Sequence, residues 1–137
     1  MDLSYLLTPL FAWIIAGSLK FIINSIKAKR LAFDLIGYGG MPSNHSSIVT
    51  SAVTIIALKE GIDEPALVAA VALAFVVILD ANSLRQQIGK HAKQINSINI
   101  GSDIPTLRER IGHTRAEIAA GVVSGISSAA LVYFLTI

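Results

Sequence analysis

The chain lacks cysteine altogether and is poor in charge. None of its 137 residues is cysteine, which excludes disulfides, thiol nucleophiles and thiolate metal sites. Only 15% of the residues are charged and 53% are hydrophobic, and the mean hydropathy of +0.66 is high for a soluble chain of this size. HExxH motifs, paired aspartates and closely spaced ligand clusters are missing too, so we expect no metal and no other cofactor. These absences favour a single membrane domain over residues 1–137.

The apolar residues gather in long blocks with few or no charges. The first block, Ser4 to Ile26, carries only Lys20 and has about the length that crosses a bilayer. Because it lacks a basic start and Lys20 stands where a cleavage site would lie, we interpret it as a retained helix and not as a signal peptide. The other blocks are Ser46–Leu58, Pro65–Leu79 and Ile118–Ile137. We therefore predict an all-α membrane bundle with about four transmembrane helices, while a buried soluble helix pair is the alternative for the two short middle blocks.

Glycine, proline and small polar residues predict where the helices begin and end. We expect a helix from near Ser43 to Gly61, followed by a tight turn into the next helix at Pro65. That helix should continue past Asp80 into a polar extension that ends near Ile95. We predict a short basic helical turn over residues 106–111, which ends at Gly112.

The last helix should begin at Thr114, with Glu117 three residues later completing a capping box. Gly121 and Gly125 within it form a GxxxG spacing. This spacing permits a homodimer, although close packing within one chain explains it equally well.

Basic residues are confined to two of the predicted loops, apart from Lys20 and Lys59. They are Lys27, Lys29 and Arg30 in the first loop and Arg85, Lys90, Lys93, Arg108, Arg110 and Arg115 in the third. The positive-inside rule places both loops in the cytoplasm, which predicts a multi-pass protein of a bacterial inner membrane. Anionic membrane lipids are better partners for these loops than nucleic acid is, because the loops adjoin membrane helices.

Two histidines stand at predicted helix starts on the cytoplasmic side. His45 opens the second helix and His113 precedes the last one, and His113 lies four residues before Glu117. This spacing lets the carboxylate hold the imidazole, although the capping box competes for the same side chain. A histidine oriented by a carboxylate and facing a second histidine is typical of a nucleophile and acid pair. His91, with no carboxylate four residues later, reads as a surface residue.

Other polar residues nearby are suited to binding a phosphate. Ser43 or Asn44 can cap the second helix, whose free N–H groups favour an anion. Arg85 can donate two parallel hydrogen bonds to a phosphate, and Lys20 can add a charge unless it extends to the headgroups. Asp80 ends an apolar run, so it is a functional candidate, with a plain helix-end charge as the alternative.

Three blocks in chain order resemble the divergent membrane branch of the type 2 phosphatidic acid phosphatase (PAP2) superfamily. They are Gly-Gly-Met-Pro-Ser-Asn-His-Ser from Gly39, then Asp80-Ala81 with Arg85, Gly89 and Ala92, then Gly112-His113-Thr114 with Glu117 and Gly121. The resemblance implies a helical membrane phosphatase that needs no metal. In it His113 would be the nucleophile, Glu117 would orient it, and His45 would protonate the leaving alcohol. Ser43, Arg85 and a lysine would hold the phosphate.

The sequence departs from the superfamily pattern in four respects. Lys20 is followed by Lys27 where the pattern has arginine, and Glu117 replaces the usual aspartate. Arg85 lies far upstream of His113, and the six helices of classical members are reduced here. The fold is therefore either truncated or completed by a second subunit.

The resulting hypothesis is a lipid phosphatase acting on phosphatidylglycerophosphate or phosphatidic acid through a phosphohistidine. An isoprenoid phosphate or diphosphate phosphatase, acting on a carrier of the undecaprenyl type, is the alternative enzyme. A non-catalytic lipid-phosphate binder or transporter is the alternative from another class, and a small structural membrane protein is a third.

Overall fold

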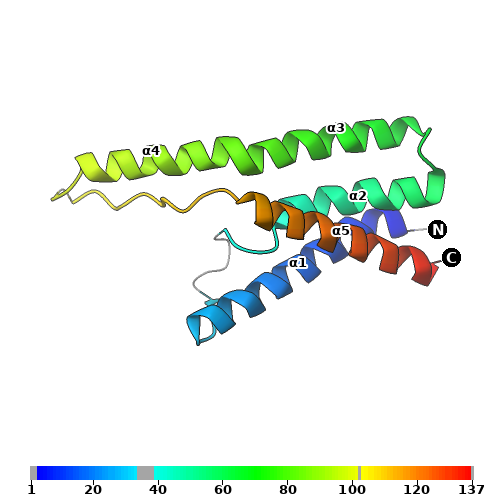
Figure 1. Cartoon of the computed structure of the whole chain (residues 1–137), viewed down its shortest axis with the longest axis horizontal. Helices are drawn as coiled ribbons and strands as arrows, with labels where there is room; N and C mark the ends of the chain where they lie inside the picture. Colours follow the sequence, from blue (N-terminus) through cyan, green and yellow to red (C-terminus); the bar gives the residue numbers. More distant parts are fainter. Residues whose placement is uncertain (1–2, 34–38, 102, 137) are drawn as a thin grey trace.

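The structure is a computed structural model that describes residues 3–33, 39–101 and 103–136. The fold is all-α, and Figure 1 shows its order along the chain. Because α3, η2 and α4 follow one another without a break, the described residues form four helices, as the sequence predicted. The elements are α1 (Ser4–Ala28), α2 (Asn44–Glu60), α3 (Pro65–Leu79), the π-helical turn η2 (Asp80–Leu84), α4 (Arg85–Ile98) and α5 (Arg115–Thr136).

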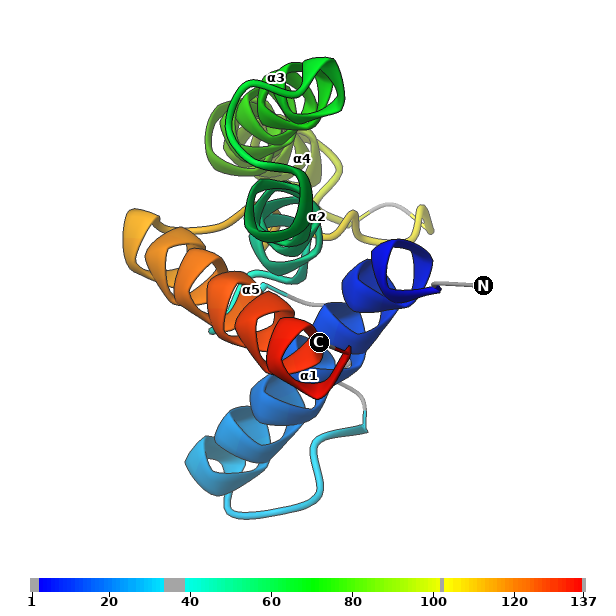
Figure 2. The same cartoon turned by 90° about the vertical axis from the view of Figure 1, so that its right-hand side faces the viewer.

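The helix α2 lies at the centre of the bundle. It packs against α1, α3 and α5, and α1 also packs against α5. Figure 2, a view along the long axis of the molecule, shows α1 and α5 crossing on one side of α2 while α3 lies on the other. The predicted ends of α2 are confirmed, since Ser43 caps its start and Gly61 caps its end.

Within the described part of the chain, three helices are long and apolar enough to cross a membrane. They are Ser4–Ala28, the continuous helix Pro65–Ile98, and Arg115–Thr136. The central helix α2 has 17 residues, or about 26 Å at the usual rise, against a hydrocarbon core of about 30 Å. A crossing by α2 therefore stays a prediction.

The distribution of side chains is the reverse of that in a soluble protein. Small and hydroxyl-bearing side chains fill the interior, whereas large apolar ones point outward, including Phe75 at 65% exposure and Phe134 at 73%. Small residues at helix contacts are typical of membrane bundles, and an apolar outer surface of this extent suits lipid rather than water. The buried polar side chains include Thr8, Ser43, Ser46, Ser47, Ser51, Ser124 and Ser128.

The GxxxG spacing in α5 serves packing within the chain. A side chain at Gly121 would collide with the Ser43 carbonyl oxygen, and a Cβ at Gly125 would lie 2.5 Å from the carbonyl oxygen of Ser47. The two glycines therefore let α5 approach the backbone of α2 closely.

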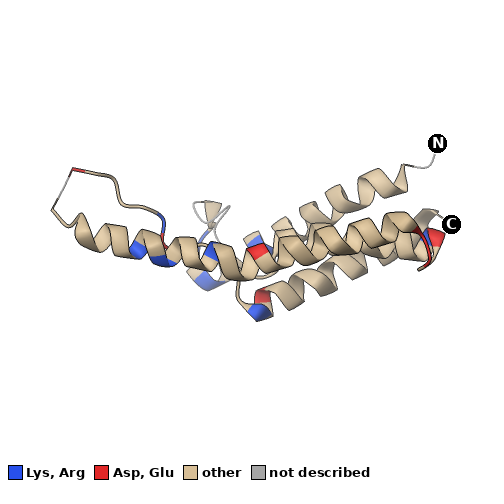
Figure 3. Cartoon of the chain, turned by 90° about the horizontal axis from the view of Figure 1, so that it is seen from above, with Lys and Arg blue, Asp and Glu red and all other residues tan. Residues whose placement is uncertain are grey.

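Basic and acidic residues are distributed unevenly along the molecule. Figure 3 shows most lysines and arginines on the half that holds α4, and the acidic turn between α2 and α3 at the other end. The predicted polar continuation of the third helix is confirmed, since α4 runs to Ile98 and extends beyond the bundle (Figure 1). His91 is exposed on α4, as expected.

The prediction of a helical turn at residues 106–111 was wrong, because this segment has no regular secondary structure. The Leu107 N–H donates to Asn96 Oδ1, and Asn96 Nδ2 donates to the Leu107 carbonyl oxygen, both at 2.8 Å. The same Nδ2 also donates to Glu109 Oε1 at 2.9 Å. The side chain of Asn96 thus occupies the backbone groups that a helix would use, and it holds the segment against α4.

Candidate active site

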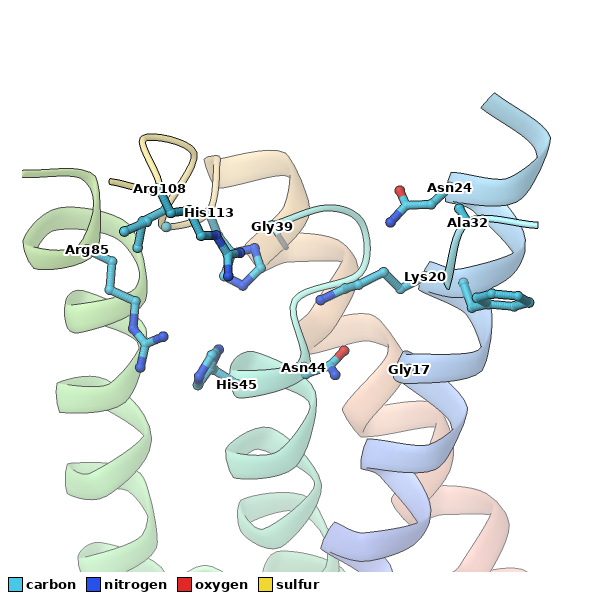
Figure 4. Close-up of a pocket in the computed structure, with 13 residues that line it drawn as sticks. Gly17, Lys20, Asn24, Ala32, Gly39, Asn44, His45, Arg85, Arg108 and His113 are labelled. Carbon is cyan, nitrogen blue, oxygen red and sulfur yellow. The ribbon is translucent and has the colours of Figure 1, made fainter. Parts of the chain in front are cut away.

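A cavity of about 250 Å³ lies where α2 begins and where the chain enters α5. Figure 4 shows side chains from α1, α2, Arg85 and the segment before α5 pointing into a common space. Its charged and polar lining residues are Lys20, Asn24, Asn44, His45, Arg85, Arg108 and His113.

The segment from Gly39 to His45 contacts the segment that contains Gly112 and His113 directly. A Cβ on Gly39 would lie 2.9 Å from the Gly112 carbonyl oxygen, so the segments pass at a distance that only glycine allows at that position. Further along, the Ser43 N–H donates to the Glu117 carbonyl oxygen at 2.9 Å. These contacts connect the start of α2 to the start of α5 and bring the two histidines into one site.

His113 is oriented by Glu117. The ring Nδ1 lies 3.1 Å from Glu117 Oε2, and the residue is buried with 5% exposure. A carboxylate accepts a hydrogen bond, so Nδ1 carries the hydrogen and Nε2 is left with the lone pair. His113 therefore has the tautomer that a nucleophile acting through Nε2 requires.

Glu117 performs both of the roles that appeared to compete in the sequence. Its Oε2 accepts the Thr114 N–H at 3.1 Å, and its own N–H donates to Thr114 Oγ1 at 3.2 Å. The capping box and the bond to the histidine thus share one carboxylate oxygen. Because the cap fixes this oxygen, the position of the imidazole follows from the start of α5.

The protonation of His113 is set mainly by burial. Desolvation lowers the pKa of its imidazole, and the positive charges of Lys20 and Arg85 act in the same direction. The hydrogen bond and the charge of Glu117 oppose this change, but the net pKa lies below the ordinary value. His113 is therefore neutral at pH 7.

His45 faces His113 across the cavity. The ring centroids are 5.8 Å apart and the ring planes meet at 61°. The Nδ1 atom of His45 is buried and has no hydrogen-bond partner among the described residues. Since a buried N–H without an acceptor is costly, a neutral His45 should carry its proton on Nε2.

Two cationic side chains flank the histidines. Lys20 lies within the apolar helix α1, and its charged side chain is buried, with 8% exposure. Arg85 donates from Nε to Asp80 Oδ2 at 2.8 Å. That bond uses Nε and leaves the two terminal nitrogens of the guanidinium for a ligand.

The residues predicted from the sequence fall into three groups. The side chains of Lys20, Asn44, His45, Arg85 and His113 line the cavity. Glu117 and Asp80 stand behind them as partners of His113 and Arg85. Ser43 is fully buried, and its Oγ accepts from the Ser46 N–H at 3.3 Å, so its side chain acts as the cap of α2. Asn44 Oδ1 is buried without a hydrogen-bond partner among the described residues.

Three polar residues of the site region were not predicted. Asn24 and Arg108 line the cavity, and Gln86 Nε2 donates to the His113 carbonyl oxygen at 2.8 Å. Asn24 lies one helical turn after Lys20, a spacing that could have revealed it. Arg108 and Gln86 gave no local signal, because their positions depend on how the segment before α5 lies against the long helix. Within the described residues, no three His, Asp or Glu side chains come close enough to hold a metal ion.

The fold and the site together define a helical membrane protein with a cavity lined by two histidines and by cationic side chains. The chain belongs to the divergent PAP2 family, whose model matches residues 1–128. It is 32% identical over 139 residues to YuiD, an uncharacterized membrane protein of Bacillus subtilis (strain 168), and the match covers 88% of each chain. No solved structure matches the chain.

Proposed function

We propose that the protein is a metal-independent lipid phosphatase that hydrolyses a lipid phosphomonoester through a phosphohistidine intermediate. The observation that carries this proposal is the geometry at His113. A buried, neutral imidazole with its Nδ1 on Glu117 Oε2 faces a second imidazole across a cavity that also holds Lys20 and Arg85. Membership of a PAP2-related family supports the same reaction class.

In the first half of the reaction, His113 Nε2 attacks the phosphorus atom. A P–N bond forms as the bond from phosphorus to the lipid alkoxide breaks, and protonated His45 gives its proton to the departing oxygen. Glu117 stabilises the positive charge that grows on the His113 ring. Lys20 and Arg85 stabilise the negative charge on the phosphoryl oxygens, and Asn44 adds an amide beside them.

In the second half, water releases the phosphate. His45, now neutral, takes a proton from the water as its oxygen attacks phosphorus, and the P–N bond to His113 breaks. Inorganic phosphate leaves, and His113 and His45 regain their starting protonation states. The two histidines thus restore the site without a metal or another cofactor.

The side of the membrane on which the site lies suggests the substrate. The cavity lies near the end of the bundle where most basic residues gather (Figure 3), which the positive-inside rule assigns to the cytoplasm. A bacterial inner membrane protein with this orientation would act on a lipid phosphate made inside the cell. Phosphatidylglycerophosphate and phosphatidic acid have the required phosphomonoester and diacylglycerol chemistry.

Phosphate release by the purified protein in detergent tests the proposal. Phosphatidylglycerophosphate, phosphatidic acid, undecaprenyl phosphate and undecaprenyl diphosphate would each be supplied with EDTA present. We expect release from a diacyl phosphomonoester that is lost in His113→Ala and retained in the control His91→Ala, which alters an exposed histidine on α4.

The other outcomes are equally informative. Release from the prenyl lipids alone would favour the isoprenoid phosphatase, and loss of release with EDTA would indicate a metal. Binding of these lipids without turnover, unchanged by His113→Ala, would favour a non-catalytic binder or transporter.

A further inference from the structure

The long helix Pro65–Ile98 contains a π-helical turn directly beside the cavity. At its end the Arg85 N–H donates to the carbonyl oxygen of Asp80, five residues earlier. In a regular α-helix this N–H would bond to the Ala81 carbonyl. The turn therefore leaves the Ala81 carbonyl oxygen without its usual helical donor, and π-turns of this kind are frequent at functional sites.

The backbone of His113 supplies the missing donor. The His113 N–H donates to the Ala81 carbonyl oxygen at 2.9 Å. On the other side of the residue, the His113 carbonyl oxygen accepts from Gln86 Nε2 at 2.8 Å. The backbone of His113 is thus bound to the long helix on both sides. Its N–H contacts the Ala81 carbonyl oxygen freed by the π-turn, and its carbonyl oxygen contacts the side chain of Gln86, which follows the turn.

The preceding residue has to be glycine for this contact to form. Gly112 has a φ of +92°, and a Cβ there would lie 2.9 Å from the Gln86 nitrogen. The close approach therefore depends on Gly112 as well as on the π-turn. Asp80, the first residue of the turn, also holds Nε of Arg85, so one short segment fixes the arginine and the histidine on the same side of the cavity.

We propose that η2 and Gln86 form a clamp that positions His113 relative to Arg85, with Gln86 as a positioning residue for the reaction. This inference deepens the proposed function and depends on it, because the clamp matters for catalysis only if His113 attacks a phosphate that Arg85 binds. Gln86 touches the backbone of His113 and not the reacting atoms. Its contribution is to keep Nε2 in line with the phosphorus atom, for which small displacements are costly in rate.

The test compares Gln86→Met, which keeps the length of the side chain but removes its donor, with Gln87→Met. Both residues are exposed on α4, so neither change should unfold the protein. We expect kcat of Gln86→Met to fall about tenfold or more with KM within about twofold, while Gln87→Met stays at the wild-type value. Gln86→Lys, which restores a donor, should recover part of kcat.

A second measurement examines the clamp without any substrate. Hydrogen exchange at the His113 amide should be slow in the wild type and in Gln87→Met, and faster in Gln86→Met. Equal kcat in the two methionine variants, or equal exchange at His113, would overturn the clamp. A wild-type protein that releases no phosphate would instead end the proposed function, and hydrogen exchange would still decide whether Gln86 holds His113.

Discussion

The double role of Glu117 allows its charge to be tested separately from its cap. In Glu117→Gln the side chain keeps an oxygen that can accept the Thr114 N–H, so the start of α5 is preserved. The negative charge next to His113 Nδ1 is lost, 3.1 Å from the ring. We therefore expect a variant that folds normally and reacts slowly.

The size of the effect follows from what the carboxylate stabilises. As Nε2 attacks phosphorus, the His113 ring becomes positive, and a hydrogen bond to a charged partner is worth about 1.5–3 kcal/mol. This corresponds to a fall in kcat of about 10- to 150-fold, since about 1.4 kcal/mol is a factor of ten. KM should change little, because Glu117 does not line the cavity.

The control for this prediction is Thr114→Ala. It removes the hydroxyl that caps the Glu117 N–H and leaves the carboxylate on His113, so it should cost about 0.5–2 kcal/mol of stability and leave kcat within about threefold. Phosphate release and thermal unfolding in detergent would be measured on both variants. The reasoning is refuted if Glu117→Gln keeps wild-type kcat, or if Thr114→Ala loses as much activity as Glu117→Gln.

Three further predictions concern protonation, charge and packing. Because burial, Lys20 and Arg85 lower the pKa of His113 against the opposing Glu117, its nucleophilic neutral form persists to lower pH. The acid limb of kcat/KM should then lie below about 6.5, and a His113 limb at or above that value would contradict the assignment. Lys20→Gln should raise KM at least tenfold, because it removes a buried cation from the cavity. Lys27→Gln, at an exposed position, should leave KM unchanged. Equal KM values in the two variants would show that Lys20 does not bind the substrate. Gly125→Val should lower stability by about 1–3 kcal/mol through overpacking, because a Cβ there meets the Ser47 carbonyl, while the exposed Ala119→Val on the same helix should have little effect. Thermal unfolding checks this last pair, and equal melting temperatures would show that α5 does not approach α2 so closely.

The features that the sequence predicted correctly depend on local chemistry. The ends of α2 at Ser43 and Gly61 and the capping box of Thr114 and Glu117 need only a few neighbouring residues. The helices themselves follow from uncharged blocks bounded by charge. The meeting of His45 and His113 was also predictable, because the alternation of helices places both helix starts at the same end of the bundle.

The features that could not be predicted depend on contacts between distant segments. The extended path of residues 106–111 results from the Asn96 side chain binding the Leu107 backbone, and nothing within the segment itself indicates it. The π-turn could not be predicted either, because Ala81 and Arg85 are ordinary helical residues in the sequence. Only the structure shows that the His113 N–H donates to the freed Ala81 carbonyl oxygen. A homodimer stays a prediction that needs a surface other than Gly121 and Gly125, since these two glycines are buried against α2.

Trapping the intermediate tests the central claim most directly. Wild-type protein would be mixed with phosphatidic acid or phosphatidylglycerophosphate carrying labelled phosphate, quenched with alkali within one turnover, and digested for mass spectrometry. The account predicts a base-stable, acid-labile phosphate on the peptide that contains His113. Turnover with no phosphate on His113, or with the label on another residue, would contradict it.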